Sequence, residues 1–294
     1  MRVLMFGQTG QVACDVVRVV REAGDITLIA LDRAAADLSD GAACAAVIAA
    51  HASDVDVVIN AAAYTAVDKA ETETDLAYAI NGTTPGAMAQ ACAAVGVPFL
   101  HVSTDYVFDG QGTDLWKPDD PTGPLGVYGA SKLDGETRIA AAGGDYAILR
   151  TSWVFSAHGA NFVKTMLRLA GARDALSVVG DQIGGPTPAY GIAQALVTMA
   201  RAFVTGQGTN GVYHYAGAPD VSWADFARAT FEDAHCAVTV TDIPTADYPT
   251  PATRPPNSRM DCTSLETNFG IKRPDWRAGL ADVLDCLGYV NEGT

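Results

Sequence analysis

The sequence has few basic residues for its acidic content. Its 294 residues include 19 lysines and arginines against 34 aspartates and glutamates, which gives a formal net charge of -15 and a pI near 4.5. A field of that sign opposes long-range attraction to nucleic acid or to an anionic membrane, so neither partner is expected. Any phosphate group that the protein binds must therefore be held by a local arrangement of hydrogen-bond donors.

Paired cysteines and long apolar runs are missing too. The six cysteines are scattered and show neither a CxxC motif nor metal-ligand spacing, so we expect reduced, mostly buried thiols and no metal site. No stretch approaches the roughly 18 apolar residues that a membrane span requires. The amino-terminal MRVLMFG has a single arginine and a very short apolar run, which indicates a first strand and not a signal peptide. We therefore expect a cytoplasmic protein.

What the first half of the chain does contain is a regular alternation of short apolar runs and helical patterns. The expected strands span residues 3–6, 27–31, 55–60, 99–103 and 146–150. The expected helices span residues 11–22, 42–50, 76–95 and 128–142. Strands without polar alternation are typical of a parallel sheet covered on both faces. The pattern predicts an α/β fold with a doubly wound, Rossmann-like parallel sheet.

The rhythm changes after residue 150. A helix near 161–170, a helix over 190–203, a strand around 211–215 and a helix beginning after Ser222 are separated by segments rich in glycine and proline. We expect residues 1–152 to form a dinucleotide-binding domain. Residues 153–294 are expected to form a smaller, interleaved substrate domain, from which some segments return to the first domain.

A glycine loop joins the first expected strand to the first expected helix. In FGQTGQVA, Gly7 permits a tight turn, Gly10 lets the backbone approach a pyrophosphate, and the small Ala13 allows close helix packing. The free N–H groups at the start of the helix supply an anion site. This spacing, GxxGxxA, is the one seen in short-chain dehydrogenases, and it predicts a bound dinucleotide.

The end of the second expected strand bears on which dinucleotide is used. Asp32 would bond an adenosine ribose hydroxyl and favour NAD, whereas the adjacent Arg33 could hold the additional phosphate of NADP. The sequence leaves NADPH and NADH both open.

A tyrosine and a lysine four residues apart, Tyr128 and Lys132, share one helix face in VYGASK. The spacing alone arises often by chance, but here it follows the strand that ends in Ser103 and Thr104, at the sheet edge where α/β folds bind ligands. Ketone reduction needs a proton for the developing alkoxide, and a neighbouring ammonium should lower the pKa of the phenol. Thr104 offers a hydroxyl that polarises the carbonyl oxygen.

Several longer blocks occur in a fixed order: FGQTGQV, VINAAAYTAVDKAE, STDYVFDG, PLGVYGASKLDGE, LRTSWVF, DQIGGPTPA and YPTPATRPPNSRM. With them the chain resembles the extended short-chain dehydrogenases/reductases, and within these the reductases of dTDP-linked 4-keto-6-deoxy sugars. The resemblance implies reduction of dTDP-4-dehydro-6-deoxy-L-mannose to dTDP-L-rhamnose by hydride transfer from NADPH or NADH.

The resemblance also implies roles for individual residues. Tyr128 is the expected proton donor, Lys132 its tuner and ribose clamp, and Thr104 the carbonyl partner. The expected cofactor-binding residues are Gly7, Gly10, Gln11, Val12, Asp32, Arg33, Asp37, Leu38, Ala62, Ala63, Tyr64, Thr65, Tyr128 and Lys132. The expected substrate-binding residues are Thr104, Asp105, Tyr128, Trp153, Arg254, Asn257 and Ser258.

The pattern of some relatives, in which acidic residues bind magnesium at a dimer interface, is only partly present. Asp15 could serve as a ligand, but Tyr190 cannot serve as an acidic one, so the sequence does not support Mg²⁺, and either a monomer or a homodimer is expected. Two other functions stay open. One is a nucleotide-sugar epimerase or dehydratase, although Tyr106 stands where dehydratases carry a second acid. The other is a non-catalytic dinucleotide-binding regulatory subunit.

Overall fold

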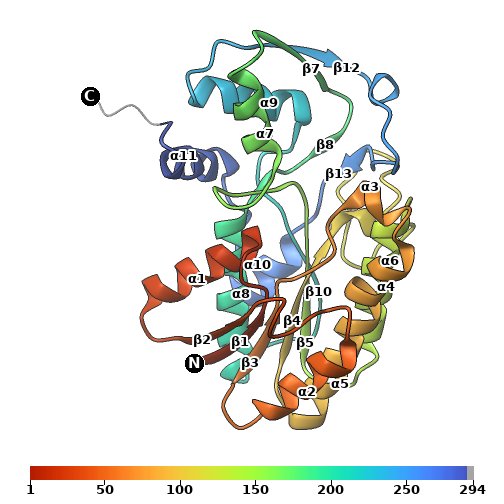
Figure 1. The fold of residues 1–294 in the computed structure, drawn as a ribbon, viewed down its shortest axis with the longest axis vertical. Coiled ribbons are helices and arrows are strands. Elements are labelled where there is room, and N and C mark those ends of the chain that lie inside the picture. The colour runs from red at the N-terminus through yellow and green to blue at the C-terminus, as the bar shows by residue number, and fades with distance from the viewer. Residues whose placement is uncertain (290–294) are drawn as a thin grey trace.

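The computed structural model describes residues 1–289, and its larger part is built on one sheet (Figure 1). Six parallel strands lie in the order β10-β5-β4-β3-β1-β2. Their bounds are β1 Arg2–Phe6, β2 Thr27–Leu31, β3 Val57–Asn60, β4 Phe99–Thr104, β5 Tyr146–Thr151 and β10 Gly211–Tyr215. Each strand predicted from the sequence is present, with the third beginning two residues later than expected.

Helices cover both faces of the sheet, as Figure 1 shows. On one side lie α1 (Gln11–Ala23), α8 (Ala189–Val204) and α10 (Thr263–Phe269), and on the other α2 (Gly41–Ala50), α5 (Thr84–Val95) and α6 (Val127–Ala140). Two separate apolar clusters, one on each face, fill the space between helices and strands. The predicted doubly wound α/β fold is confirmed.

The predicted single helix over residues 76–95 is interrupted in the structure. After the short helix α3 (Val67–Ala70), the chain forms α4 (Thr74–Tyr78), a π-helical turn η1 (Ala79–Thr83) and then α5. Within the turn, the buried Asn81 side chain accepts a hydrogen bond from Tyr64 N and donates to Tyr64 O and to Ser131 Oγ. These bonds tie the turn to α6, and wide turns of this kind occur often beside functional sites.

A second group of elements lies above the carboxyl ends of the sheet strands (Figure 1). Its helices are α7 (Phe162–Ala170), α9 (Trp223–Asp233) and α11 (Trp276–Cys286). Its short strands are β6 Val154–Phe155, β7 Ala175–Val179, β8 Ile183–Gly184, β9 Thr187–Pro188, β11 Val221–Ser222, β12 Thr239–Ile243 and β13 Asn257–Ser258. Ser222 begins α9 through a reciprocal capping box with Asp225. Phe155, Phe226 and Trp276 pack in the core of this group.

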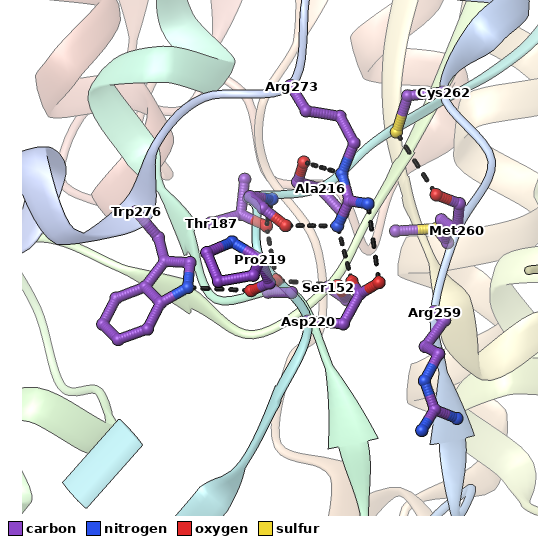
Figure 2. A network of polar contacts seen from close by, with 12 residues as sticks. Ser152, Thr187, Ala216, Pro219, Asp220, Arg259, Met260, Cys262, Arg273 and Trp276 are labelled. Atoms are coloured by element: carbon purple, nitrogen blue, oxygen red, sulfur yellow. Dashed lines mark hydrogen bonds and ion pairs between the residues drawn. The ribbon is translucent and has the colours of Figure 1, made fainter. Parts of the chain in front are cut away.

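Polar contacts connect this second group to the sheet (Figure 2). The Arg273 guanidinium donates to the carbonyl oxygens of Ala216 and Gly217 and pairs with Asp220. Gly217 N in turn donates to Thr187 Oγ1. The segment after β10 is therefore fixed against β9, just before α8 and close to the edge of the sheet. Within residues 1–289, no helix is both long and apolar enough to cross a membrane.

Candidate active site

A cleft of about 770 Å³ opens at the carboxyl ends of the sheet strands. Its lining comes from both parts of the chain: the loops after β1 to β5 on one side, and Trp153, Val154, Gly159 and Ala160 on the other. All of the expected cofactor-binding residues except Tyr64 line this cleft. The Tyr64 hydroxyl instead donates to Glu73, and its backbone is held by Asn81.

The glycine loop is shaped for a dinucleotide. Gly7 has φ +110°, a conformation that side chains disfavour, and a Cβ there would press on Ala61 and Ala62. Gly10 is the N-cap of α1 and offers no side chain to its first turn, while a Cβ at Gly10 would meet no atom within 4 Å. The first N–H groups of α1 therefore have no side-chain cap from Gly10. They lie at the cleft wall, where the oxygens of a diphosphate can accept hydrogen bonds from them.

The loop after β2 places charges of both signs at one end of the cleft. Asp32 accepts a hydrogen bond from Ala35 N, and the exposed Arg33 pairs with Asp37 at 3.3 Å. Asp37 also accepts from Ser39 N, which lowers the pKa of its carboxyl. Asp32 and Arg33 both line the cleft, so a hydrogen-bond acceptor and a cationic donor lie at the same end of it.

Tyr128 and Lys132 both line the cleft from the first turns of α6, which begins at Val127 after Gly126. The ammonium was expected to lower the pKa of the phenol. This expectation is wrong, because desolvation raises the pKa of Tyr128 to about 12 and interaction with the Thr104 side chain offsets it only partly. Lys132 points elsewhere: its Nζ donates to Val102 O at 2.6 Å and lies 3.0 Å from His101 Nε2.

Thr104 ends β4 and faces the same cleft. Its hydroxyl accepts from Tyr106 N and donates to Asp105 Oδ1 at 3.1 Å. Asp105 is 3 % exposed, and burial raises the pKa of its carboxyl to about 6 although interactions with the Ser258 and Thr104 side chains oppose the shift. Asp105 Oδ2 has no partner, so the cleft wall holds a buried acceptor that a sugar hydroxyl could satisfy.

Trp153 forms part of the opposite wall, immediately after β5. Its backbone has φ +49°, which is rare for a bulky residue, and its indole stacks on Trp223 with ring centroids 3.5 Å apart. Trp223 is in turn fixed by a hydrogen bond from its Nε1 to Gln182. The strained position is thus held by packing, which is typical of residues that shape a ligand site.

The other three expected substrate-binding residues lie outside the cleft lining. Arg254 pairs with Asp68 at 2.8 Å. Asn257 is buried, donates to Asp114 O and accepts from Arg259. Ser258 is buried, and its side chain acts to lower the pKa of Asp105. In this structure Asn257 and Ser258 support the wall, and Arg254 anchors the proline-rich segment to α3 through Asp68.

Comparison with known proteins agrees with this geometry. Residues 1–288 match the family model of the RmlD substrate binding domain. The chain belongs to this family. The dTDP-4-dehydrorhamnose reductase of Sinorhizobium fredii is 44% identical over 284 residues, 94% of each chain. That of Escherichia coli K12 is 39% identical over 295 residues, 98% of each chain. The resemblance inferred from the sequence blocks is confirmed.

Solved structures of RmlD-type reductases superpose closely. A dTDP-4-dehydrorhamnose reductase from Clostridium acetobutylicum has a TM-score of 0.90 at 34% identity, and covers 98% of this chain and 100% of its own. One from Bacillus anthracis in complex with NADP has a TM-score of 0.90 at 32% identity, covering 97% and 98%. A UDP-glucose 4-epimerase from Thermus thermophilus, 19% identical with a TM-score of 0.79, shares the fold.

Asp15 and Tyr190 each hydrogen-bond to another side chain. In this RmlD-family chain Asp15 is 5 % exposed and accepts from Ser156 Oγ, while Tyr190 donates to Glu22. Burial raises the pKa of Asp15. Within residues 1–289 there is no group of three or more His, Cys, Asp or Glu side chains that could hold a metal ion.

Several residues around the site are not among those that the sequence predicted to bind cofactor or substrate. Asn60 and His101 lie behind Lys132, Tyr106 packs edge-on against Tyr128, and Thr151 lines the cleft with a buried hydroxyl that has no partner. Thr151 is paired with Thr104 across β4 and β5. Its position at a strand end is the signal that could have identified it, because ligands bind at the carboxyl ends of parallel strands.

Proposed function

We propose that this protein reduces dTDP-4-dehydro-6-deoxy-L-mannose to dTDP-L-rhamnose with NADPH or NADH, the activity for which its relatives are named. The observation that carries the proposal is that Thr104, Tyr128 and Lys132 line the same cleft as the glycine loop. Reduction of a ketone needs a hydride donor, a proton donor and a group that polarises the carbonyl, and this cleft offers a place or a residue for each.

The dinucleotide, when bound, supplies the hydride. Its diphosphate would be held by the N–H groups at the start of α1, its adenosine end by the loop that carries Asp32 and Arg33, and its nicotinamide ribose by Lys132. Lys132 has a backbone and an imidazole partner on β4. These contacts fix Nζ at the cleft wall.

Tyr128 is proposed as the proton donor. With a pKa near 12 the phenol is fully protonated at neutral pH, which suits a group that must give a proton to a developing alkoxide. The Thr104 hydroxyl would orient and polarise the carbonyl oxygen. Asp105 Oδ2, buried without a partner, is the acceptor proposed for a sugar hydroxyl.

Replacing Tyr128 by phenylalanine tests the assignment. We expect oxidation of NADPH by the keto sugar nucleotide to fall on the order of 10²- to 10⁴-fold, because a positioned acid is lost and the fold is kept. Tyr106→Phe is the matched control, since Tyr106 lies edge-on to Tyr128 and loses the same hydroxyl without the proposed role. Unchanged turnover in Tyr128→Phe, or an inert wild type that retains NAD through purification, would sink the proposal and favour an epimerase.

We infer further that the enzyme works in the cytoplasm, as a monomer or homodimer, without nucleic acid. The net charge of -15 supports the last point. Sedimentation at several protein concentrations distinguishes the two assembly states.

A further inference from the structure

A buried hydrogen-bond chain runs from the loop after β3 to the lysine of the site. Ala62 N donates to Asn60 Oδ1 at 3.1 Å, Asn60 Nδ2 lies 3.1 Å from His101 Nδ1, and His101 Nε2 lies 3.0 Å from Lys132 Nζ. Asn60, His101 and Lys132 are each 1 % exposed or less. Water therefore cannot readily replace a missing partner at any of these three links.

The direction of each link follows from the first. A backbone N–H can only donate, so it holds the Asn60 oxygen and turns the Asn60 NH₂ group toward His101 Nδ1. Burial lowers the pKa of His101 well below its usual value, so the ring is neutral and carries one proton. With Nδ1 accepting, that proton sits on Nε2, facing Lys132. An amine has a lone pair to accept it, and an ammonium has none.

We propose that Asn60 and His101 are positioning residues that present a hydrogen-bond donor to Lys132 and thereby favour its neutral amine in the ligand-free protein. Lys132 is then a group that titrates close to neutrality, and its charge is not permanent. Burial lowers the pKa of Lys132 to about 8, which agrees with this arrangement. That Lys132 serves in a reaction rests on the proposed reductase function.

The charges of the ionisable groups around α6 do not offset the preference of Lys132 for the neutral amine. Glu136, one turn further along α6, raises the pKa of Lys132 by its charge, but it is itself engaged by Arg150 and Ser103. Asp68 is paired with Arg254. The other ionisable groups on elements packed against α6 are Lys69 of α3, Asp75 and Tyr78 of α4, Cys92 of α5, Asp105 and Tyr106 of η2 (Asp105–Val107), and Tyr146 of β5.

The tautomer of His101 can be measured directly by ¹⁵N NMR of the histidine-labelled, ligand-free protein. We expect a neutral ring protonated on Nε2 above the Lys132 midpoint, with shifts that change where Lys132 titrates. His214 is the internal control: its Nδ1 faces Trp116 O and its Nε2 faces Arg150, so it must carry the opposite tautomer. A His101 protonated on Nδ1 at every pH would overturn the proposal.

Asn60→Asp tests the same hydrogen-bond chain, because it should reverse the direction of the hydrogen bonds that His101 makes. A carboxylate accepts from both Ala62 N and His101 Nδ1, so Nε2 becomes an acceptor that suits an ammonium. We expect the Lys132 midpoint, followed by ¹³Cε NMR and identified by its loss in Lys132→Met, to rise by about one pH unit or more. An unchanged midpoint in folded Asn60→Asp overturns the proposal. If Asn60→Asp does not fold, the wild-type tautomer decides. Neither measurement depends on turnover, so the proposal for Lys132 and the proposal of reductase activity can fail independently of each other.

Discussion

At the scale of single residues, Asp105 makes stability depend on pH. Its carboxyl has a pKa of about 6 when folded against 3.8 ordinarily, so the protonated form is favoured by folding. The contribution of Asp105 to the free energy of unfolding is therefore greatest below pH 4, and it declines by up to about 3 kcal/mol as the pH rises from 4 to 6. Asp105→Asn should remove this decline, measured as the free energy of unfolding in urea at several pH values.

The control for that measurement is Asp56→Asn. The Arg2 backbone N–H lowers the pKa of Asp56, so its contribution has the opposite sign and is lost as pH falls. If the free energies of unfolding of wild type and Asp105→Asn change with pH in parallel, folding does not raise the pKa of the Asp105 carboxyl. The buried acceptor proposed for the sugar hydroxyl is then a carboxylate with an ordinary pKa.

The same scale shows which properties the sequence could predict. The motif positions placed Thr104, Tyr128 and Lys132 in one cleft, because strand ends and helical spacing are local properties. The charge states could not be predicted. They depend on partners such as His101, 31 residues from Lys132 in the chain, and on burial by segments that pack only in the folded molecule.

At the scale of elements, the glycine inside YGASK is a packing requirement. A Cβ at Gly129 would overlap the carbonyl oxygen of Tyr106, so the first turn of α6 can approach η2 only with glycine there. Gly129→Ala should displace α6, destabilise the protein by roughly 1–3 kcal/mol and lower turnover with it. Thermal unfolding and assay together check this. Gly171→Ala is the matched control, because a Cβ there makes only an ordinary contact with Arg168 O.

The elements also show a limit of pattern reading. Residues 76–95 have an uninterrupted helical pattern, yet the π-helical turn η1 interrupts the α-helix where Asn81 bonds Tyr64 and Ser131. Asn81 reaches Ser131 across 50 residues of sequence. A local pattern does not contain that contact. If Gly129→Ala had the same stability and turnover as wild type, α6 would tolerate the displacement that a Cβ at position 129 imposes.

At the scale of the whole molecule, the two parts of the chain should unfold together. α1 carries the phosphate loop and also bonds the second part through Asp15 to Ser156 and Arg18 to Asp282. A ligand bound at the loop should therefore stabilise both. NADPH at about 100 times its Kd contributes about 2.7 kcal/mol, which should raise a single Tm by roughly 4–5 °C. Tyr128→Phe should keep this rise, and Gly7→Val should lose it. Two calorimetric transitions, of which NADPH moves only one, would show instead that the parts unfold independently.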